Sequence, residues 1–118
     1  MANQIINKIG TSVIHVDTTD GEITMAELKH ADEATPVTAK IIEIFYNLKA
    51  GASLAIDRGG TDVWKIAAVA STSNLVGHVN YRPSGIVLRG TNTADIGVTV
   101  AVFGTLESVV TIIVKKTY

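Results

Sequence analysis

The residues that could ligate a metal ion are few and scattered along the chain. The imidazole donors are His15, His30 and His78, which lie too far apart in sequence to form a metal-ligand motif. The segment Asp17–Glu22 places three carboxylates around a glycine, but it lacks the spacing and the distal glutamate of an EF-hand loop. We predict a hydrogen-bonded turn there, and no metal site or cofactor in the chain.

Residues for covalent catalysis or phosphate binding are also without a motif. The chain has no cysteine, which excludes thiolate chemistry and disulfides. No Gly-x-Ser-x-Gly sequence is present, and Arg82–Gly85 is typical of a turn. Gly59 and Gly60 could cradle an anion, but no helix start follows them, and a hairpin loop explains them better. We therefore predict no catalytic residues and a protein that is not an enzyme.

The elements that position these residues are strands, because side chains branched at the β-carbon dominate the composition. Valine, isoleucine and threonine occur 14 times each, 42 of 118 residues together, against 6 leucines. Such side chains suit a pleated, half-buried surface better than a helix. The clearest predicted strands are Thr11–Val16, Lys40–Leu48, Ser53–Asp57, Val63–Ala67 and Gly85–Arg89.

One short helix is expected ahead of the main run of strands. Thr24 and Glu27 fit a capping box, in which each side chain satisfies a backbone N–H of the other residue. Met25 and Leu28 lie three residues apart and would share one face. The pattern predicts a turn or two of helix within residues 25–33, and the thin apolar stripe leaves an irregular arm as the alternative.

The loop between two central strands decides which side chains share a face. A five-residue loop, Arg58–Asp62, places Ile56 opposite Trp64 and gathers the large apolar groups on one side. A two-residue turn at Gly59–Gly60 would instead place Ala55 opposite Trp64. Because a one-residue slip moves a whole set of side chains to the other face, we favour the longer loop.

Two segments near the C-terminus alternate in the same way and predict a second hairpin. Residues 98–102 and 110–114 would pair around the loop Gly104–Ser108, with Val100 opposite Ile112. The reverse faces of these strands are also apolar. We therefore expect both faces to be covered, one by a second sheet and the other by a neighbouring subunit or arm.

These elements predict a mostly β protein, an antiparallel β-sandwich or jelly roll of about 7–8 short strands. The length of 118 residues fits one domain. We place an N-terminal arm at residues 1–10 and a single β-sandwich domain at residues 11–118.

Charge and hydropathy narrow the range of partners. The net charge is −1, with 10 basic and 11 acidic residues, which disfavours nucleic-acid binding. No apolar run approaches the ~18 residues of a membrane helix, so no membrane partner is expected. The first residues lack the basic and apolar regions of a signal peptide.

Two groups of residues are candidates for binding a partner. The isoleucines Ile5, Ile6 and Ile9 of the N-terminal arm could dock on another subunit. A recognition loop is the second candidate, formed by His78, Tyr81 and Arg82, although an ordinary polar loop explains the same residues.

The second half of the chain resembles small virion proteins of tailed bacteriophages. The residues that carry the resemblance are Leu54–Arg58 leading to Val63–Trp64, then Gly85–Arg89, Asn92–Val100 and the closing strand Thr111–Lys116. The resemblance covers residues 37–118 and rests on the run of short strands. No functional residue is carried over by it.

This resemblance implies a non-enzymatic virion structural protein, foremost a capsid decoration (cement) subunit. Such a subunit is synthesised in the host cytoplasm, forms homo-oligomers and binds the major capsid protein or other virion subunits at the capsid surface. Two alternatives stay open: a tail or head–tail connector subunit, and a small glycan-binding β-sandwich module. The glycan-binding alternative would need an exposed aromatic shelf around Tyr81 and Arg82.

Overall fold

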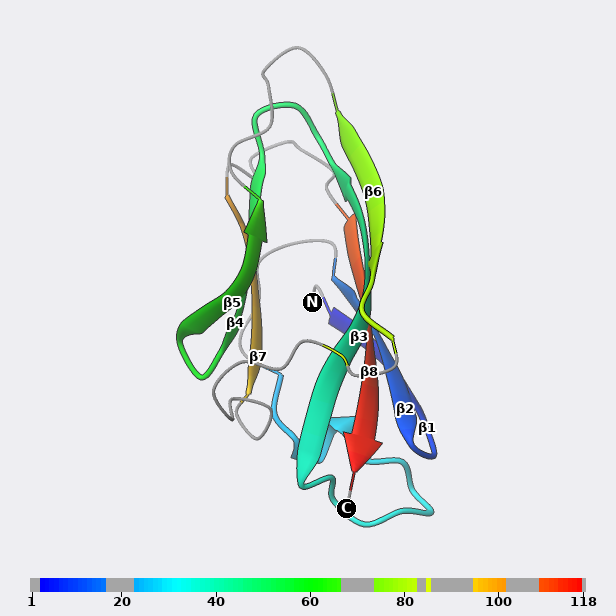
Figure 1. The fold of residues 1–118 in the computed structure, drawn as a ribbon. Coiled ribbons are helices and arrows are strands. Elements are labelled where there is room, and N and C mark those ends of the chain that lie inside the picture. Colours follow the sequence, from blue (N-terminus) through cyan, green and yellow to red (C-terminus); the bar gives the residue numbers. More distant parts are fainter. Residues whose placement is uncertain are drawn as a thin grey trace.

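The protein is a β-sandwich of two antiparallel sheets, as the sequence predicts (Figure 1). The structure is a computed structural model, and it describes residues 3–16, 23–66, 74–82, 85, 95–101 and 109–117. These residues form eight strands and one short 3-10 turn. Residues 86–89 of the predicted strand Gly85–Arg89 lie outside the described residues, as do residues 17–22 and the predicted loop Gly104–Ser108.

The larger sheet has five strands. Its order is β1 (Asn3–Lys8), β2 (Thr11–Val16), β8 (Val109–Thr117), β3 (Thr38–Leu48) and β6 (Leu75–Asn80). The predicted strand Thr11–Val16 is confirmed at both ends. Residues 3–8, which were expected within an arm, form β1 at the edge of this sheet and pair with β2. They join the sheet because Ile5 lies opposite Ile14 and both side chains point towards the core.

The smaller sheet has the order β5 (Thr61–Ile66), β4 (Ser53–Arg58) and β7 (Ile96–Ala101). Ile56 lies opposite Trp64, so the predicted register is confirmed. The predicted five-residue loop is wrong, because Arg58 pairs with Thr61 around a two-residue turn. The turn uses Gly59 and Gly60 at positive φ, 59° and 92°, where glycine carries no steric cost. A bulge beside Asp57 then shifts the register by one residue.

The predicted C-terminal hairpin is also wrong. β7 pairs with β4 in the smaller sheet, whereas β8 lies between β2 and β3 in the larger sheet. The alternation nevertheless predicted the inward faces, since Val98, Val110, Ile112 and Val114 are all buried. A period of two tells which face of a strand is apolar, but it does not tell which strand lies beside it.

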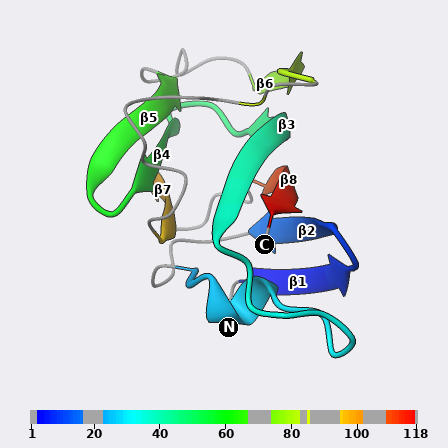
Figure 2. The same ribbon diagram turned by 60° about the horizontal axis from the view of Figure 1, so that its bottom comes forward.

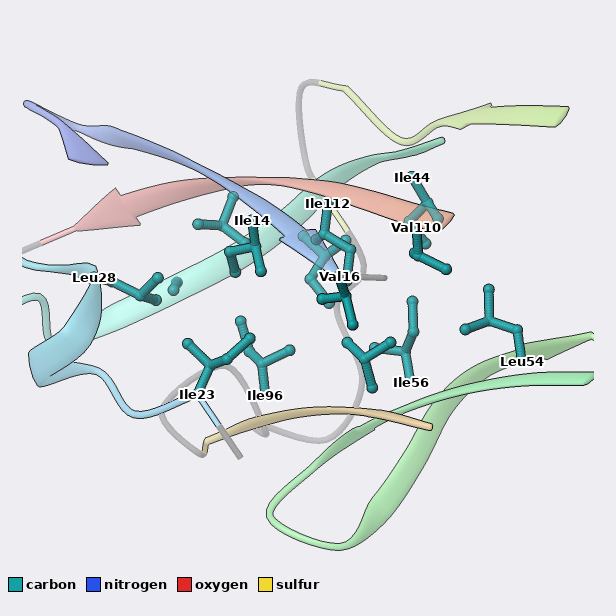
Figure 3. Packing of buried hydrophobic residues seen from close by; sticks show 14 of the residues in the cluster. Ile14, Val16, Ile23, Leu28, Ile44, Leu54, Ile56, Ile96, Val110 and Ile112 are labelled. Carbon is teal, nitrogen blue, oxygen red and sulfur yellow. The ribbon is translucent and has the colours of Figure 1, made fainter. Parts of the chain in front are cut away.

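The core lies between the two sheets (Figure 3). Ile14, Val110 and Ile112 project from the larger sheet towards Ile56 and Leu54 of the smaller sheet. Ile23 extends this contact by pairing with Ile96 at the edge of β7, through backbone hydrogen bonds of 2.7 and 2.9 Å.

A short turn closes one end of the sandwich, below β1 in Figure 2. The predicted helix within residues 25–33 is reduced to the single 3-10 turn η1 (Ala26–Leu28). The capping box forms: the Glu27 N–H donates to the Thr24 hydroxyl (3.3 Å), and the Thr24 N–H donates to the Glu27 carboxylate (3.4 Å). Leu28 is fully buried against the core, and the chain becomes extended at the next residue.

A buried ion pair fastens the segment after this turn to the sheet. The Lys116 Nζ pairs with the Glu33 carboxylate and donates to the Leu28 carbonyl (2.6 Å). The side chains of Lys116 and Glu33 are 0% and 4% exposed. Glu33 also accepts the backbone N–H groups of His30 (2.8 Å) and Gly10 (3.1 Å). Burial raises the pKa of Glu33, but these hydrogen bonds outweigh it and lower the pKa to about 2.

This ion pair makes the fold sensitive to acid. Because the folded-state pKa of Glu33 is depressed from 4.5 to about 2, its contribution to the free energy of unfolding is present above pH 4.5 and is lost as the pH falls towards 2. Glu33→Gln should therefore lower the melting temperature near neutral pH and have a smaller effect near pH 2. Thermal unfolding followed by circular dichroism across this range measures the difference.

The matched control is Asp32→Asn, which removes an exposed carboxylate from the same segment. It should leave the melting temperature near neutral pH almost unchanged. An equal loss of melting temperature in Glu33→Gln at both ends of the pH range would contradict the assigned role of the ion pair.

Candidate functional site

The outer faces of the two sheets differ in chemistry. On the smaller sheet the side chains that alternate with the buried ones are small or polar: Ser53, Ala55, Asp57, Lys65 and Thr99. On the larger sheet the corresponding positions include six large apolar side chains: Ile6, Val13, Phe45, Val76, Val109 and Ile113. A sheet face in contact with water is normally polar, so the outer face of the larger sheet is the candidate site.

The register brings these apolar side chains into rows across the strands. Ile6 of β1 lies beside Val13 of β2, which lies beside Ile113 of β8. Further along, Asn47 of β3 lies between Val109 of β8 and Val76 of β6. Among these residues Ile6 is 59% and Val76 is 70% exposed, so the two ends of the face are the most open to solvent.

The predicted docking isoleucines do not act as one group. Ile5 points inward and packs, partly buried, against the core. Ile6 points to the outer face, and Ile9 lies in the turn after β1 with 65% of its surface exposed. Only Ile6 and Ile9 are therefore placed to touch a partner.

The predicted recognition loop also separates into two parts. Tyr81 packs against the core, and its backbone N–H donates to the Ile42 carbonyl (2.8 Å). Tyr81 therefore does not form the exposed shelf that a glycan site would need. His78 and Arg82 instead converge on Glu43 of β3, a residue that the sequence did not single out.

Glu43 is held by His78 and Arg82 on the outer face. Its Oε1 lies 2.9 Å from the His78 Nε2; its Oε2 accepts a hydrogen bond from the Arg82 Nε (2.8 Å) and lies 2.7 Å from the Arg82 Nη2 in an ion pair. The hydrogen bond from Arg82 lowers the pKa of Glu43; burial opposes this effect, and the hydrogen bond with His78 adds to it. We call the group Glu43, His78 and Arg82 the carboxylate clamp.

An aromatic pair extends the carboxylate clamp towards the middle of the sheet. The rings of Phe45 and His78 stack with centroids 4.0 Å apart and an interplanar angle of 1°. Beside them lies a shallow, open depression of about 250 Å³, lined mainly by apolar side chains that include Phe45, Val76 and Val109. No sequence signal could have located this group, because Glu43 and Phe45 meet His78 only through the pairing of β3 with β6.

The remaining candidate ligands do not converge. His15 forms a 3.0 Å hydrogen bond with the Thr111 hydroxyl, and the His30 Nδ1 accepts the backbone N–H of Asp32 (3.0 Å). Within the described residues, no group of three or more metal-ligating side chains could hold a metal ion. The carboxylates of Asp17–Glu22 lie outside the described residues. In that same described part of the chain, no helix is long and apolar enough to cross a membrane.

Comparison with known proteins gives no family assignment. No protein-family model matches the sequence, and no curated protein matches it either. The outer face of the larger sheet therefore has to be interpreted from its own chemistry.

The carboxylate clamp should control the stacking of His78 on Phe45. Glu43→Gln keeps the shape of the side chain but removes the charge that strengthens both hydrogen bonds. We expect the His78 ring to leave the stack, so that its proton signals lose the upfield ring-current shift caused by Phe45. Proton NMR of the imidazole signals measures this change, with His15 and His30 as internal references.

Asp62→Asn is the matched control, because Asp62 also forms an ion pair through its carboxylate, but on the smaller sheet. Its Oδ2 lies 3.3 Å from the Lys65 Nζ. It should leave the His78 signals in place. Unchanged His78 shifts in Glu43→Gln would mean that packing alone holds the stack.

Proposed function

We propose that this protein is a non-enzymatic structural subunit of a tailed-bacteriophage virion, and that it acts as a capsid decoration subunit. Its task is to bind the major capsid protein at the capsid surface and to stabilise the shell. The virion assignment rests on the resemblance of residues 37–118 to small phage virion proteins. The mode of action rests on the geometry of the larger sheet.

One observation carries the proposed mode of action. The outer face of the larger sheet has apolar side chains on all five of its strands, whereas the outer face of the smaller sheet is small and polar. Covering this face with protein removes apolar surface from water, which contributes roughly 25 cal/mol for each Å² before the costs of association. The smaller sheet would then face solvent on the outside of the particle.

The polar groups on this face suit protein recognition. The carboxylate clamp satisfies Glu43 within the subunit, so that carboxylate can be covered without remaining an unpaired buried charge. The stacked rings of Phe45 and His78 give a partly exposed aromatic contact beside the depression. Aromatic side chains surrounded by apolar surface are typical of the centre of protein–protein interfaces.

The proposal is tested on virions of the phage whose genome carries this sequence. We expect mass spectrometry to find the protein in purified virions, and electron cryomicroscopy to place it on the capsid surface with the larger sheet against the shell. Density at the tail or at the head–tail junction would instead support a connector subunit. Absence from the virion would overturn the virion assignment.

A variant pair tests which face binds. Ile113→Lys places a charge at the centre of the outer face, where Glu43 is its cross-strand neighbour and can pair with it, so the fold should persist. We expect this variant to rebind at least about tenfold more weakly to shells stripped of the protein. Thr99→Lys places the same charge on the exposed outer face of the smaller sheet and should rebind like the wild type. Equal rebinding of both variants would contradict the assignment of the binding face.

A further inference from the structure

The four edge strands of the sandwich offer different opportunities for a further strand to pair. Among the described residues, β5 and β7 have one strand neighbour each, as do β1 and β6. β7 is capped at Ile96 by the bridge to Ile23. β5 is distorted by the bulge opposite Asp57 and carries the exposed charges of Asp62 and Lys65. Bulges and charges of this kind protect an edge from pairing.

The edge of β1 has no bulge, and the Asn7 side chain on its inner face donates to the Glu27 and Lys29 carbonyls of the η1 segment (2.8 and 3.3 Å). The pairing of β1 with β2 is regular over six residues. Lys8, at the end of β1, is its one charged residue. Ile6, in the middle of the strand, points outward with 59% of its surface exposed. Within the part of the chain that the structure describes, no strand pairs with the outer side of β1, so its backbone N–H and C=O groups beside an exposed isoleucine form a surface that another strand can extend.

We infer that β1 pairs antiparallel with β1 of a second copy of this chain, so that the two larger sheets join into one ten-stranded sheet. The inference deepens the proposed function, on which it rests, by naming a sister subunit as one partner. The assignment to a second copy follows from the residue order of β1. A two-fold axis at Ile6 makes the outer face of the strand complementary to itself.

The register follows from the alternation of faces. With the axis at Ile6, each Ile6 lies opposite Ile6 of the second copy, and Gln4 lies opposite Lys8 of the second copy. All of these side chains belong to the outer face, so the inner faces of the two sheets also coincide. The two lysines stay apart, and the row Ile6, Val13 and Ile113 continues into the same row of the second copy.

The edge of β6 does not match itself as well. A two-fold axis at the middle of its outer face would place His78 against His78 of the second copy, although His78 is already engaged with Glu43. An axis at Gly77 would place Val76 opposite His78 of the second copy. The self-complementary edge is therefore that of β1.

The absence of cysteine allows a direct test of this pairing. In the otherwise wild-type chain, Ile6→Cys should oxidise to a disulfide-linked dimer, because directly opposed residues of antiparallel strands lie within reach of a disulfide. Val76→Cys, on the exposed edge strand at the other end of the sheet, is the matched control and should stay monomeric under the same mild oxidation. Cross-linking that is equally slow in both variants, or faster in Val76→Cys, would overturn the inference.

Charge variants test the register without a covalent bond. Gln4→Glu should tighten the dimer in sedimentation experiments, because each new carboxylate faces Lys8 of the second copy. Gln4→Lys should weaken it by about tenfold over the two symmetric contacts, and the double variant Gln4→Lys with Lys8→Glu should restore it. Residues 4 and 8 lie about 13 Å apart within one strand, so the rescue cannot arise inside a single subunit.

These measurements use the purified protein alone, and circular dichroism confirms that each variant is folded. A wild-type protein that remains monomeric at the highest attainable concentration, with no response to the Gln4 variants, would overturn the β1 pairing. That outcome would not affect the proposed function. The Ile113→Lys and Thr99→Lys variants test it separately, through binding to stripped shells.

Discussion

The structure depends on burying every second side chain of its strands between two sheets. Ile14, Ile56 and Ile112 are each fully buried: Ile14 and Ile112 lie opposite each other on β2 and β8 of the larger sheet, and Ile56 of β4 faces them from the smaller sheet. Branched side chains at these positions lose little freedom in an extended backbone, so the same residues favour the strand and fill the core. The turns, the closing segment and the outer faces are all arranged around this contact.

Polar groups inside the sandwich fix how its parts are joined at the end closed by η1. Arg58 is 3% exposed and donates from its Nη1 to the Ala39 carbonyl (2.7 Å), which links β4 of one sheet to β3 of the other. Burial lowers the pKa of Arg58 to about 10, and Asp95 opposes this effect. Lys116 and Glu33 fasten the segment after η1 in a similar way. Since a buried ion needs partners at defined positions, these residues specify one arrangement of strands and segment.

The sequence predicted what depends on local alternation, and it failed where a distant partner decides. The fold class, the strand Thr11–Val16 and the opposition of Ile56 and Trp64 followed from a period of two. The supposed hairpin of β7 and β8 failed, because two strands with the same alternation can face one core from opposite sheets. The turn at Gly59–Gly60 was rejected because an unbulged register would expose apolar groups, and the bulge removes that objection.

The candidate site shows the same limit in its chemistry. His78 and Arg82 were recognisable as polar residues close in sequence, but their common partner Glu43 lies on a strand more than thirty residues earlier. The apolar reverse face of β8 was visible in the sequence, and the structure extends it over the neighbouring strands into one surface. Because the inner side chains of those strands are locked in the core, the outer face is presented on a rigid scaffold. A rigid face loses little conformational freedom when it is covered, which lowers the entropic cost of association at this surface.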